Sequence, residues 1–173
     1  MSLTILYEDN HLIALKKLSG EIVQSDKTGD ITLTEKVKSY IKKKYNKPGD
    51  VFLGLIHRLD RPVGGVILFA RTSKSLSRMN TLFREKKIKK EYWAIVDEKP
   101  PIEDGELINW LKKNQIKNKS RAYNNEVRDS KKAILKYSLI GRSKNYFYLK
   151  VIPLTGRHHQ IRVQLSFIGC KIK

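Results

Sequence analysis

Two apolar segments separated by a short charged loop constrain the fold of this chain more than any other stretch. Residues 51–56 and 66–70 are the apolar segments, and Pro62, Gly64 and Gly65 lie between them, where they break regular backbone pairing. The pattern predicts a strand, a polar loop and a second strand. The charged side chains of this loop are therefore the first candidates for a functional site.

The loop contains one carboxylate, Asp60, between Arg58 and Arg61. We expect this carboxylate to stay ionised, because opposite charges within a few ångströms favour the charged form. An ionised carboxylate shielded from water can act as a nucleophile or a base. On this stretch alone, however, a structural salt bridge is the favoured interpretation, since ion-pair networks produce the same pattern.

The charge balance of the chain predicts a polyanionic partner. Among 173 residues there are 36 Lys+Arg and 17 Asp+Glu, a formal net charge of +19. We expect nucleic acid before a membrane surface, because the lysines cluster along the chain. The alternative is a basic surface that serves only solubility.

The cysteine and histidine content argues against disulfides and metals. The single cysteine, Cys170, leaves no disulfide framework and no CxxC site, so we expect a reducing compartment, the cytoplasm. His158 and His159 are adjacent, which would place them on different faces of a helix and make them a poor metal pair. No signal peptide is recognisable, and no apolar run is long enough to span a bilayer.

The periodicity of the remaining chain predicts an α+β fold with a mixed, largely antiparallel sheet flanked by a few helices. We expect a single domain over residues 1–173 and assign no regular structure to residues 104–132. Helix ends are predicted from capping signals: a capping box at Thr32 and Glu35, N-caps at Ser73 and Thr155, and a stop at Gly169. Strands are predicted at residues 4–18 (two, around a turn at 9–11), 21–24, 91–96, 133–140 and 145–154, and helices at 33–45, from 73 and from 155.

Three motifs occur in order along the chain: His57-Arg58-Leu59-Asp60, then the K-x-Y-x-A pattern of residues 90–94, then the TGR-x-HQIR pattern of residues 155–162. Together they resemble the RluA-like family of RNA pseudouridine synthases, from about Ile5 to the C-terminus. The resemblance implies that family's fold. It also implies an enzyme that isomerises uridine to pseudouridine in structured RNA, ribosomal or transfer RNA, with no metal and no redox cofactor.

The resemblance also implies residue roles. Asp60 would be the catalytic carboxylate, and three roles for it stay open: attack on the sugar, addition to the base, or removal of a ribose proton. Tyr92 would stack on the flipped-out uracil, which helps to offset the cost of unstacking, and assistance of proton transfer at C5 of the base is a further role that stays open. A core aromatic on a strand is the alternative for Tyr92. Arg162 would pair with Asp60.

The remaining residues of the motifs are expected to bind the substrate. Arg58 is the candidate for a phosphate contact or for flipping the nucleotide, and a structural hydrogen bond is the favoured role of His57. The other members of this substrate-binding set are Arg61, Lys90 and Arg157.

The chain departs from the family pattern in several places. Pro62 and the three residues after it replace a Thr-Ser-Gly sequence, His158 replaces Thr or Ser, and residues 16–20 lack the proline of Asn-Lys-Pro-x-Gly. The family normally continues past Cys170, so we expect a C-terminally truncated catalytic domain. We further expect a monomer without an N-terminal RNA-binding module. A catalytically impaired RNA-binding protein of the same fold is the alternative function.

Overall fold

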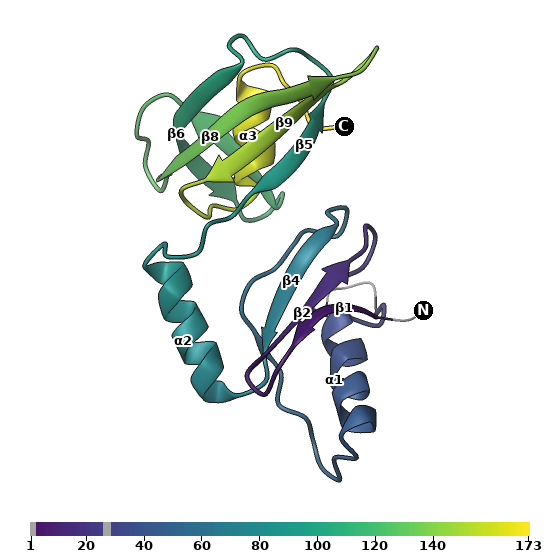
Figure 1. Cartoon of the computed structure of the whole chain (residues 1–173). Helices are drawn as coiled ribbons and strands as arrows, with labels where there is room; N and C mark the ends of the chain where they lie inside the picture. Colours follow the sequence, from purple (N-terminus) through teal and green to yellow (C-terminus); the bar gives the residue numbers. More distant parts are fainter. Residues whose placement is uncertain (1–2, 26–28) are drawn as a thin grey trace. The chain divides into compact units, whose positions relative to one another are not determined.

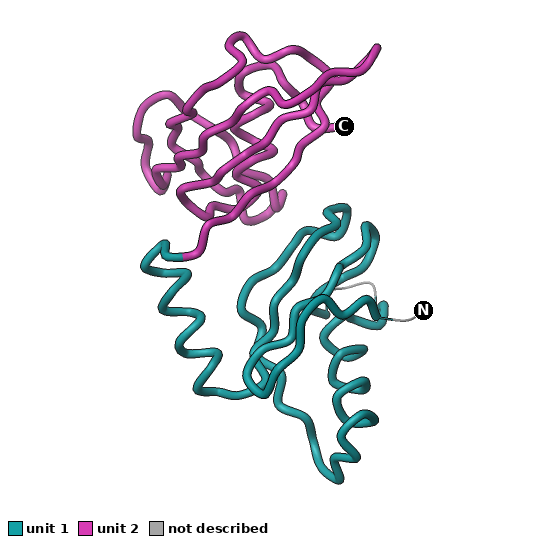
Figure 2. Tube along the Cα trace, in the orientation of Figure 1, with its two compact units in different colours: residues 1–87 teal, residues 88–173 magenta. Residues whose placement is uncertain are grey.

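The computed structural model describes residues 3–25 and 29–173, and the chain divides into two compact units (Figures 1 and 2). Unit 1 is Met1–Lys87 and unit 2 is Ile88–Lys173. Both contain an antiparallel sheet and at least one helix, which confirms the predicted α+β class. That the units together form one catalytic domain remains a prediction. Among the described residues, no helix is both long and apolar enough to cross a bilayer.

Unit 1 is a four-stranded sheet with two helices. The strand order is β1-β2-β4-β3, and each described pairing is antiparallel. The predicted strands and helices at 4–18, 33–45, 66–70 and from 73 are confirmed, although β3 is shorter than expected. The elements are β1 (Thr4–Glu8), β2 (Leu12–Lys17), α1 (Leu33–Lys44), β3 (Gly54–Leu55), β4 (Gly65–Ala70) and α2 (Ser73–Arg84).

The core of unit 1 lies between the sheet and α1. Ile13 and Leu15 of β2 alternate inward and meet Val37 of α1, all fully buried. The capping box of Thr32 and Glu35 starts α1 as predicted. The predicted N-cap of α2 is wrong by one residue, because Thr72, not Ser73, accepts the hydrogen bond from the third residue of the helix.

Residues 21–24 were predicted to form a strand, and the prediction is wrong. Ile22 and Val23 are buried, as the apolar pattern suggested. Their carbonyl groups, however, accept hydrogen bonds from the backbone N–H groups of Leu33 and Thr34 at the start of α1. They complete the N-terminus of a helix, whose first N–H groups have no partner within the helix itself.

The carboxylate of Glu8 in β1 links this strand to α1 and to Arg71, the residue that follows β4. Glu8 accepts hydrogen bonds from Tyr40 (2.9 Å), Lys44 (2.8 Å) and Tyr45 (2.8 Å), and it pairs with Arg71 (3.1 Å). Burial raises the pKa of Glu8, but the hydrogen bonds from Lys44, Tyr45 and Tyr40 outweigh burial and hold the pKa below its ordinary value of 4.5. The folded state therefore favours the ionised form.

Replacing Glu8 with glutamine is expected to lower the free energy of unfolding by about 1–2 kcal/mol at pH 7, because charge-assisted hydrogen bonds are lost. Since the folded pKa of Glu8 is depressed, its contribution is present above pH 4.5 and is lost as the pH falls below that value. The free energies of unfolding of wild type and Glu8→Gln, measured with urea, should therefore differ at neutral pH and become equal in acid. The same substitution at exposed Glu126 is the control. A constant difference at every pH would contradict this account.

Unit 2 is a five-stranded antiparallel sheet with one helix packed on one face. Its strand order is β5-β9-β8-β6-β7. The predicted strand at 91–96 and the hairpin that follows 132 are confirmed. The elements are β5 (Tyr92–Val96), β6 (Asp104–Asn114), β7 (Lys119–Tyr123), β8 (Lys131–Arg142), β9 (Phe147–Pro153) and α3 (Gln160–Phe167).

Strands β6 and β7 correct the expectation that residues 104–132 lack regular structure. In β6 the inward positions are Leu107, Asn109 and Leu111, so a polar residue occupies the middle of the buried face. The outward positions include Ile108 and Trp110, which are apolar. At the centre of the strand a polar residue points inward and apolar residues point outward, so the usual alternation is inverted. The strand therefore cannot be recognised from the alternation in its sequence.

The core of unit 2 lies between the sheet and α3. Leu165 of α3 is fully buried against Leu149 and Val151 of β9. The predicted stop of this helix is confirmed, because Gly169 follows the last turn with a φ of +87°, a conformation that favours glycine. The predicted N-cap, Thr155, is wrong: His159 holds that position in a left-handed conformation.

Candidate functional site

Asp60 lies in a tight turn between β3 and β4, and its side chain is exposed. The backbone N–H of Val63 donates to the carbonyl of Asp60 at 3.0 Å, which closes the turn. Arg61 forms an ion pair with Asp30 at 2.9 Å. The charged loop predicted from the sequence is therefore present, and its backbone has a defined conformation.

A second segment, residues 17–20, binds every carbonyl of this turn, and we call it the clamp. The ammonium group of Lys17 donates to the carbonyls of Asp60 (3.1 Å), Arg61 (3.0 Å) and Val63 (2.6 Å). The carbonyl of Pro62 accepts from the hydroxyl of Ser19 at 2.9 Å. The N–H of Gly20 adds a second bond to the carbonyl of Arg61 at 2.8 Å. The clamp thus fixes the backbone from which Asp60 projects.

Lys17 is 0% exposed, which is unusual for a lysine. Burying an ammonium group is costly unless hydrogen bonds replace its hydration, and here carbonyl oxygens surround it. Burial lowers the pKa of Lys17, and the charges of Glu21 and Asp60 oppose this shift. Sequence reasoning assigned no role to this residue. The signal was present, since Ile13, Leu15 and Lys17 alternate along β2 and therefore point to the same buried face.

His57 completes the description of the first motif. Its Nε2 accepts a hydrogen bond from the backbone N–H of Leu68 in β4 at 3.1 Å, and its ring stacks on Phe83 of α2. In the neutral imidazole the proton is then on Nδ1. This is a structural hydrogen bond of the kind favoured from the sequence. Contact of His57 with a substrate stays a prediction.

The second motif begins β5. Tyr92 is half-buried at the first position of this strand, opposite Val151 of β9, and borders the apolar core of unit 2. The amino group of Lys90 lies 4.0 Å from the position that a Cβ atom would take at Gly156. Lys90 is therefore close to the turn that carries the third motif.

Gln160 organises the third motif. Its side-chain oxygen accepts from the hydroxyl of Thr155 (2.8 Å) and from the backbone N–H of Arg157 (2.9 Å), while its amide donates to the carbonyl of Ile134 (3.0 Å). Arg157 in turn donates from Nε to the carbonyl of Lys132 at 3.0 Å. The turn before α3 is thus attached to β8, and sequence reasoning did not identify Gln160 as its centre.

The two histidines of this motif lie before α3 and their rings stack on each other at 3.7 Å, so the prediction that they occupy different faces of a helix is wrong. The left-handed conformation of His159 brings the rings together. His158 Nδ1 also shares a hydrogen bond of 2.9 Å with the hydroxyl of Ser120. Among the described residues, no group of three or more His, Cys, Asp or Glu side chains is arranged to hold a metal ion.

The predicted site residues fall into two groups. Asp60, Arg58, Arg61 and His57 belong to unit 1. Tyr92, Arg162, Lys90 and Arg157 belong to unit 2, where Arg162 is exposed on α3. The unit 1 members lie in the loop between β3 and β4, whereas in unit 2 Tyr92 is on β5, Arg162 is on α3, and Lys90 and Arg157 lie outside the helices and strands.

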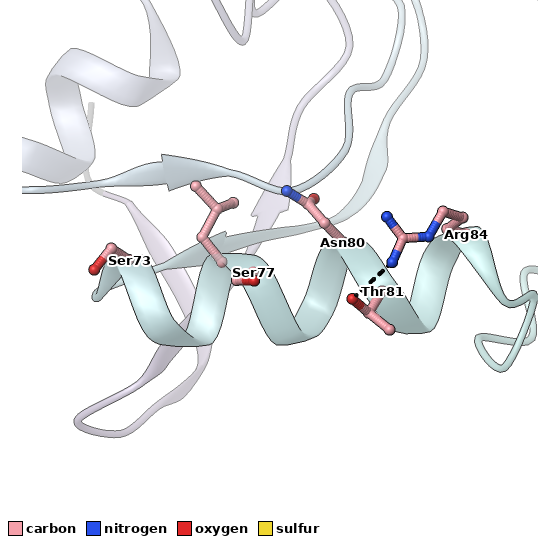
Figure 3. Close-up of a pocket in the computed structure, with 6 residues that line it drawn as sticks. Ser73, Ser77, Asn80, Thr81 and Arg84 are labelled. Carbon is pink, nitrogen blue, oxygen red and sulfur yellow. Dashed lines mark hydrogen bonds between the residues drawn. The ribbon is translucent and has the colours of Figure 1, made fainter.

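A pocket of about 380 Å³ lies along α2, and it includes none of these residues (Figure 3). Within the pocket, the guanidinium of Arg84 donates a hydrogen bond to the hydroxyl of Thr81 at 3.2 Å. Its described lining offers serine and threonine hydroxyls but no carboxylate, imidazole or thiol, so no side chain of these kinds is at hand to activate a hydroxyl as a nucleophile. The lining residues are Ser73, Leu76, Ser77, Asn80, Thr81 and Arg84.

Comparisons of this chain with a family model and with curated proteins all match RNA pseudouridine synthases. A family model described as RNA pseudouridylate synthase matches residues 11–167. The chain is 34% identical over 171 residues to ribosomal large subunit pseudouridine synthase C of Buchnera aphidicola, covering 97% of this chain and 51% of the relative. It is 31% identical over 169 residues to the protein of the same name from Rickettsia prowazekii, covering 97% and 54%. The chain spans about half the length of these curated relatives.

Solved structures show the same fold. The human RNA pseudouridylate synthase domain containing 4 superposes with a TM-score of 0.82 at 25% identity, covering 98% of this chain and 66% of the human chain. Human RNA pseudouridylate synthase domain containing 1 gives a TM-score of 0.79 at 18% identity. The fold implied by the three motifs is therefore confirmed.

Proposed function

The chain belongs to the RNA pseudouridylate synthase family, and we propose that it isomerises uridine to pseudouridine in structured RNA, as a monomer in the cytoplasm. The observation that carries this proposal is the clamped turn that presents Asp60 within the matched residues. Ribosomal RNA is the first substrate to test, because the curated relatives are named for the large ribosomal subunit. Transfer RNA is the second.

The reaction moves one bond within a nucleotide. The bond from C1′ of ribose to N1 of uracil breaks, the base rotates, and C5 becomes bonded to C1′. The hydrogen on C5 leaves as a proton and N1 gains a proton, so the product is an isomer of the substrate. No net oxidation or reduction takes place, so the reaction needs no redox cofactor, and the proposal, like the resemblance, invokes no metal. Asp60 supplies the carboxylate at the sugar–base junction. A fixed backbone suits this role, since catalysis depends on holding reacting groups in near-attack geometry.

The other residues retain the roles that the resemblance implies. Tyr92 stacks on the extruded base, and the pairing of Arg162 with Asp60 stays a prediction. Arg58 contacts a phosphate or helps to flip the nucleotide. Arg61, Lys90, Arg157 and His57 complete the proposed substrate-binding set.

The test is base-resolved detection of pseudouridine. Purified protein is incubated with unmodified ribosomal and transfer RNA transcripts, and every uridine is then assayed. New pseudouridine at a small number of defined positions is the expected result, and it identifies the RNA. RNA that is retained at low salt but contains no pseudouridine at any position would contradict the proposal and indicate a binding protein.

Removing the ring of Tyr92 is expected to cost more than removing its hydroxyl. Base–aromatic stacking contributes about 1–3 kcal/mol per base, so Tyr92→Ala should lower kcat/KM by about tenfold to a hundredfold. Tyr92→Phe should stay within a few-fold of wild type if stacking is the main role. Equal losses in both variants would assign the role to the hydroxyl instead. Wild-type kcat/KM in Tyr92→Ala would remove this residue from the site.

A further inference from the structure

The sheet of unit 2 has an outer face, which we define as the face opposite α3. In Figure 1 α3 lies behind β8 and β9, and within the described residues of unit 2 no helix lies on the outer face. Residues at alternate strand positions point to this face, because side chains of a strand alternate between its two sides. In β5 the outward residues are Trp93 and Ile95, while Ala94 and Val96 point into the core.

The outer face is rich in exposed aromatic and aliphatic side chains. Trp93 is 77% exposed and Tyr148 is 37% exposed, and Ile95 and Ile108 are also exposed. The open face of an antiparallel sheet usually alternates as the polar one. Exposed apolar patches on a soluble protein commonly mark an interaction surface. Both tryptophans of the chain, Trp93 and Trp110, are on this face.

Basic side chains lie among these rings. Lys150 is directly opposite Trp93 in the β5–β9 pairing. Lys132 is opposite Trp110 in the β6–β8 pairing, with its ammonium group 5.6 Å from the indole ring. Among the described strand residues that point outward on this face, the acidic ones are Asp104 and Glu106, and Glu106 pairs with Lys136. Two carboxylates just outside the strands also contact the face: Glu91 accepts a hydrogen bond from the indole N–H of Trp93 at 3.1 Å, and Asp129 pairs with Lys112 at 3.7 Å. The basic residues of the face are Lys112, Lys119, Arg121, Lys132, Lys136 and Lys150.

The face is continuous with the third motif. Arg157, a proposed substrate-binding residue, donates to the backbone carbonyl of Lys132 near the start of the central strand β8, and Lys132 is opposite Trp110 of β6. Lys132 and Ser138 are about 20 Å apart along β8, and Ser138 is paired with Lys150 of β9. A chain of nucleotides that passes Arg157 would therefore meet Lys132 and Trp110 first and Trp93 further on.

We propose that the outer face of the unit 2 sheet binds a single-stranded segment of the RNA, outside the nucleotide that reacts. The proposal rests on the proposed function, which supplies RNA as the partner. Stacking on exposed rings requires bases that are not in a duplex, and lysines between the rings attract the phosphates that connect those bases. The positive charge of the face complements an RNA strand better than it complements a second copy of this basic chain.

Tryptophan fluorescence tests this directly, because both tryptophans are on the face. The intact chain is titrated with a single-stranded oligouridine and, separately, with an RNA duplex of the same length. We expect the oligouridine to quench the fluorescence and to bind more tightly than the duplex at the same salt concentration. Binding without a fluorescence change, or equal affinity for the duplex, would overturn the proposal.

A face variant and a matched control sharpen the test. Trp93→Ala/Lys150→Gln removes one exposed ring and one charge from the face, whereas Phe52→Ala/Lys38→Gln makes equivalent changes on exposed side chains of unit 1. The face variant should bind oligouridine about tenfold more weakly, and the control should remain within twofold of wild type. Lys132→Gln, a single exposed change, should weaken binding with an unaltered thermal unfolding midpoint. Equal affinities in the face variant and the control would overturn the proposal.

Two readouts separate this inference from the proposed function. Binding of oligouridine does not require turnover. Fluorescence quenching without any pseudouridine formation would therefore contradict the proposed isomerase function but would support the outer face as an RNA-binding surface. If both variants form pseudouridine with the same KM, the result would contradict RNA binding by the outer face but would support the proposed function. We expect the face variant to raise KM for ribosomal RNA transcripts more than it changes kcat. The proposal would also be overturned if oligouridine does not quench the tryptophan fluorescence and Trp93→Ala changes the sedimentation coefficient. That result would assign the face to contact with a second copy of the chain.

Discussion

Replacing Asp60 with asparagine is expected to reduce pseudouridine formation by about 10³-fold or more. Asparagine has the same shape as aspartate but lacks the negative charge that the proposed chemistry uses. The turn itself should survive, because the clamp binds backbone carbonyls rather than the Asp60 side chain. Initial rates with ribosomal RNA transcripts, measured at several RNA concentrations, give kcat and KM for wild type and variant.

Asp50→Asn is the matched control for this variant. Asp50 is an exposed carboxylate of unit 1, and it belongs to none of the three motifs. Its substitution makes the same chemical change and should leave kcat/KM within about twofold of wild type, as is usual for surface substitutions. Asp60→Asn should still retain RNA in a binding assay. Full activity in Asp60→Asn would assign the chemistry to another residue.

Replacing Lys17 with methionine is expected to have the second-largest effect. Methionine has a similar length but donates no hydrogen bond, so the carbonyls of Asp60, Arg61 and Val63 each lose a donor. The carbonyls of Asp60 and Arg61 keep their backbone donors, but the loss of three hydrogen bonds from a buried charged group should still lower the free energy of unfolding by about 3 kcal/mol. The turn that carries Asp60 should also lose its defined position, and kcat should fall by about tenfold to a hundredfold, because a misplacement of about 1 Å can reduce a rate by that much.

Lys16→Met is the control, because Lys16 is the exposed neighbour of Lys17 in β2. Urea unfolding gives the stability of each variant, and kcat is measured at a temperature at which both variants are folded. We expect Lys17→Met to lower kcat while the dissociation constant for RNA changes little, whereas Lys16→Met leaves kcat unchanged. A loss of stability in Lys17→Met with a wild-type kcat would show that the clamp supports the fold and does not position Asp60.

Local sequence signals predicted much of unit 1 and the hairpin of unit 2. The capping box at Thr32 and the apolar residues at helical spacing after it are short-range patterns, and they identify α1 correctly. Residues 21–24 and β6 were misassigned because their backbones and side chains respond to distant partners. The carbonyls of Ile22 and Val23 bind the start of α1, and Asn109 is buried beside Gln164 of α3.

In the candidate site, too, features set by local sequence were predicted and features set by distant partners were not. Asp60 was identified because its motif is contiguous in the sequence. Lys17 was not, because its partners lie more than forty residues further along the chain, and only its position on the inward face of β2 hinted at them. The stacking of His158 on His159 depends on a left-handed backbone at His159, which is uncommon for a residue other than glycine and is therefore hard to predict.

Release of tritium from RNA labelled at C5 of uridine tests the central claim most directly, because the new bond to C5 displaces the hydrogen at that atom. Wild type, Asp60→Asn and Asp50→Asn are incubated with ribosomal RNA transcripts that carry 5-tritiated uridine. The account predicts one tritium released for each uridine converted by wild type and by Asp50→Asn, and none above background by Asp60→Asn. Release by Asp60→Asn at the wild-type rate, or bound RNA without release by wild type, would contradict it.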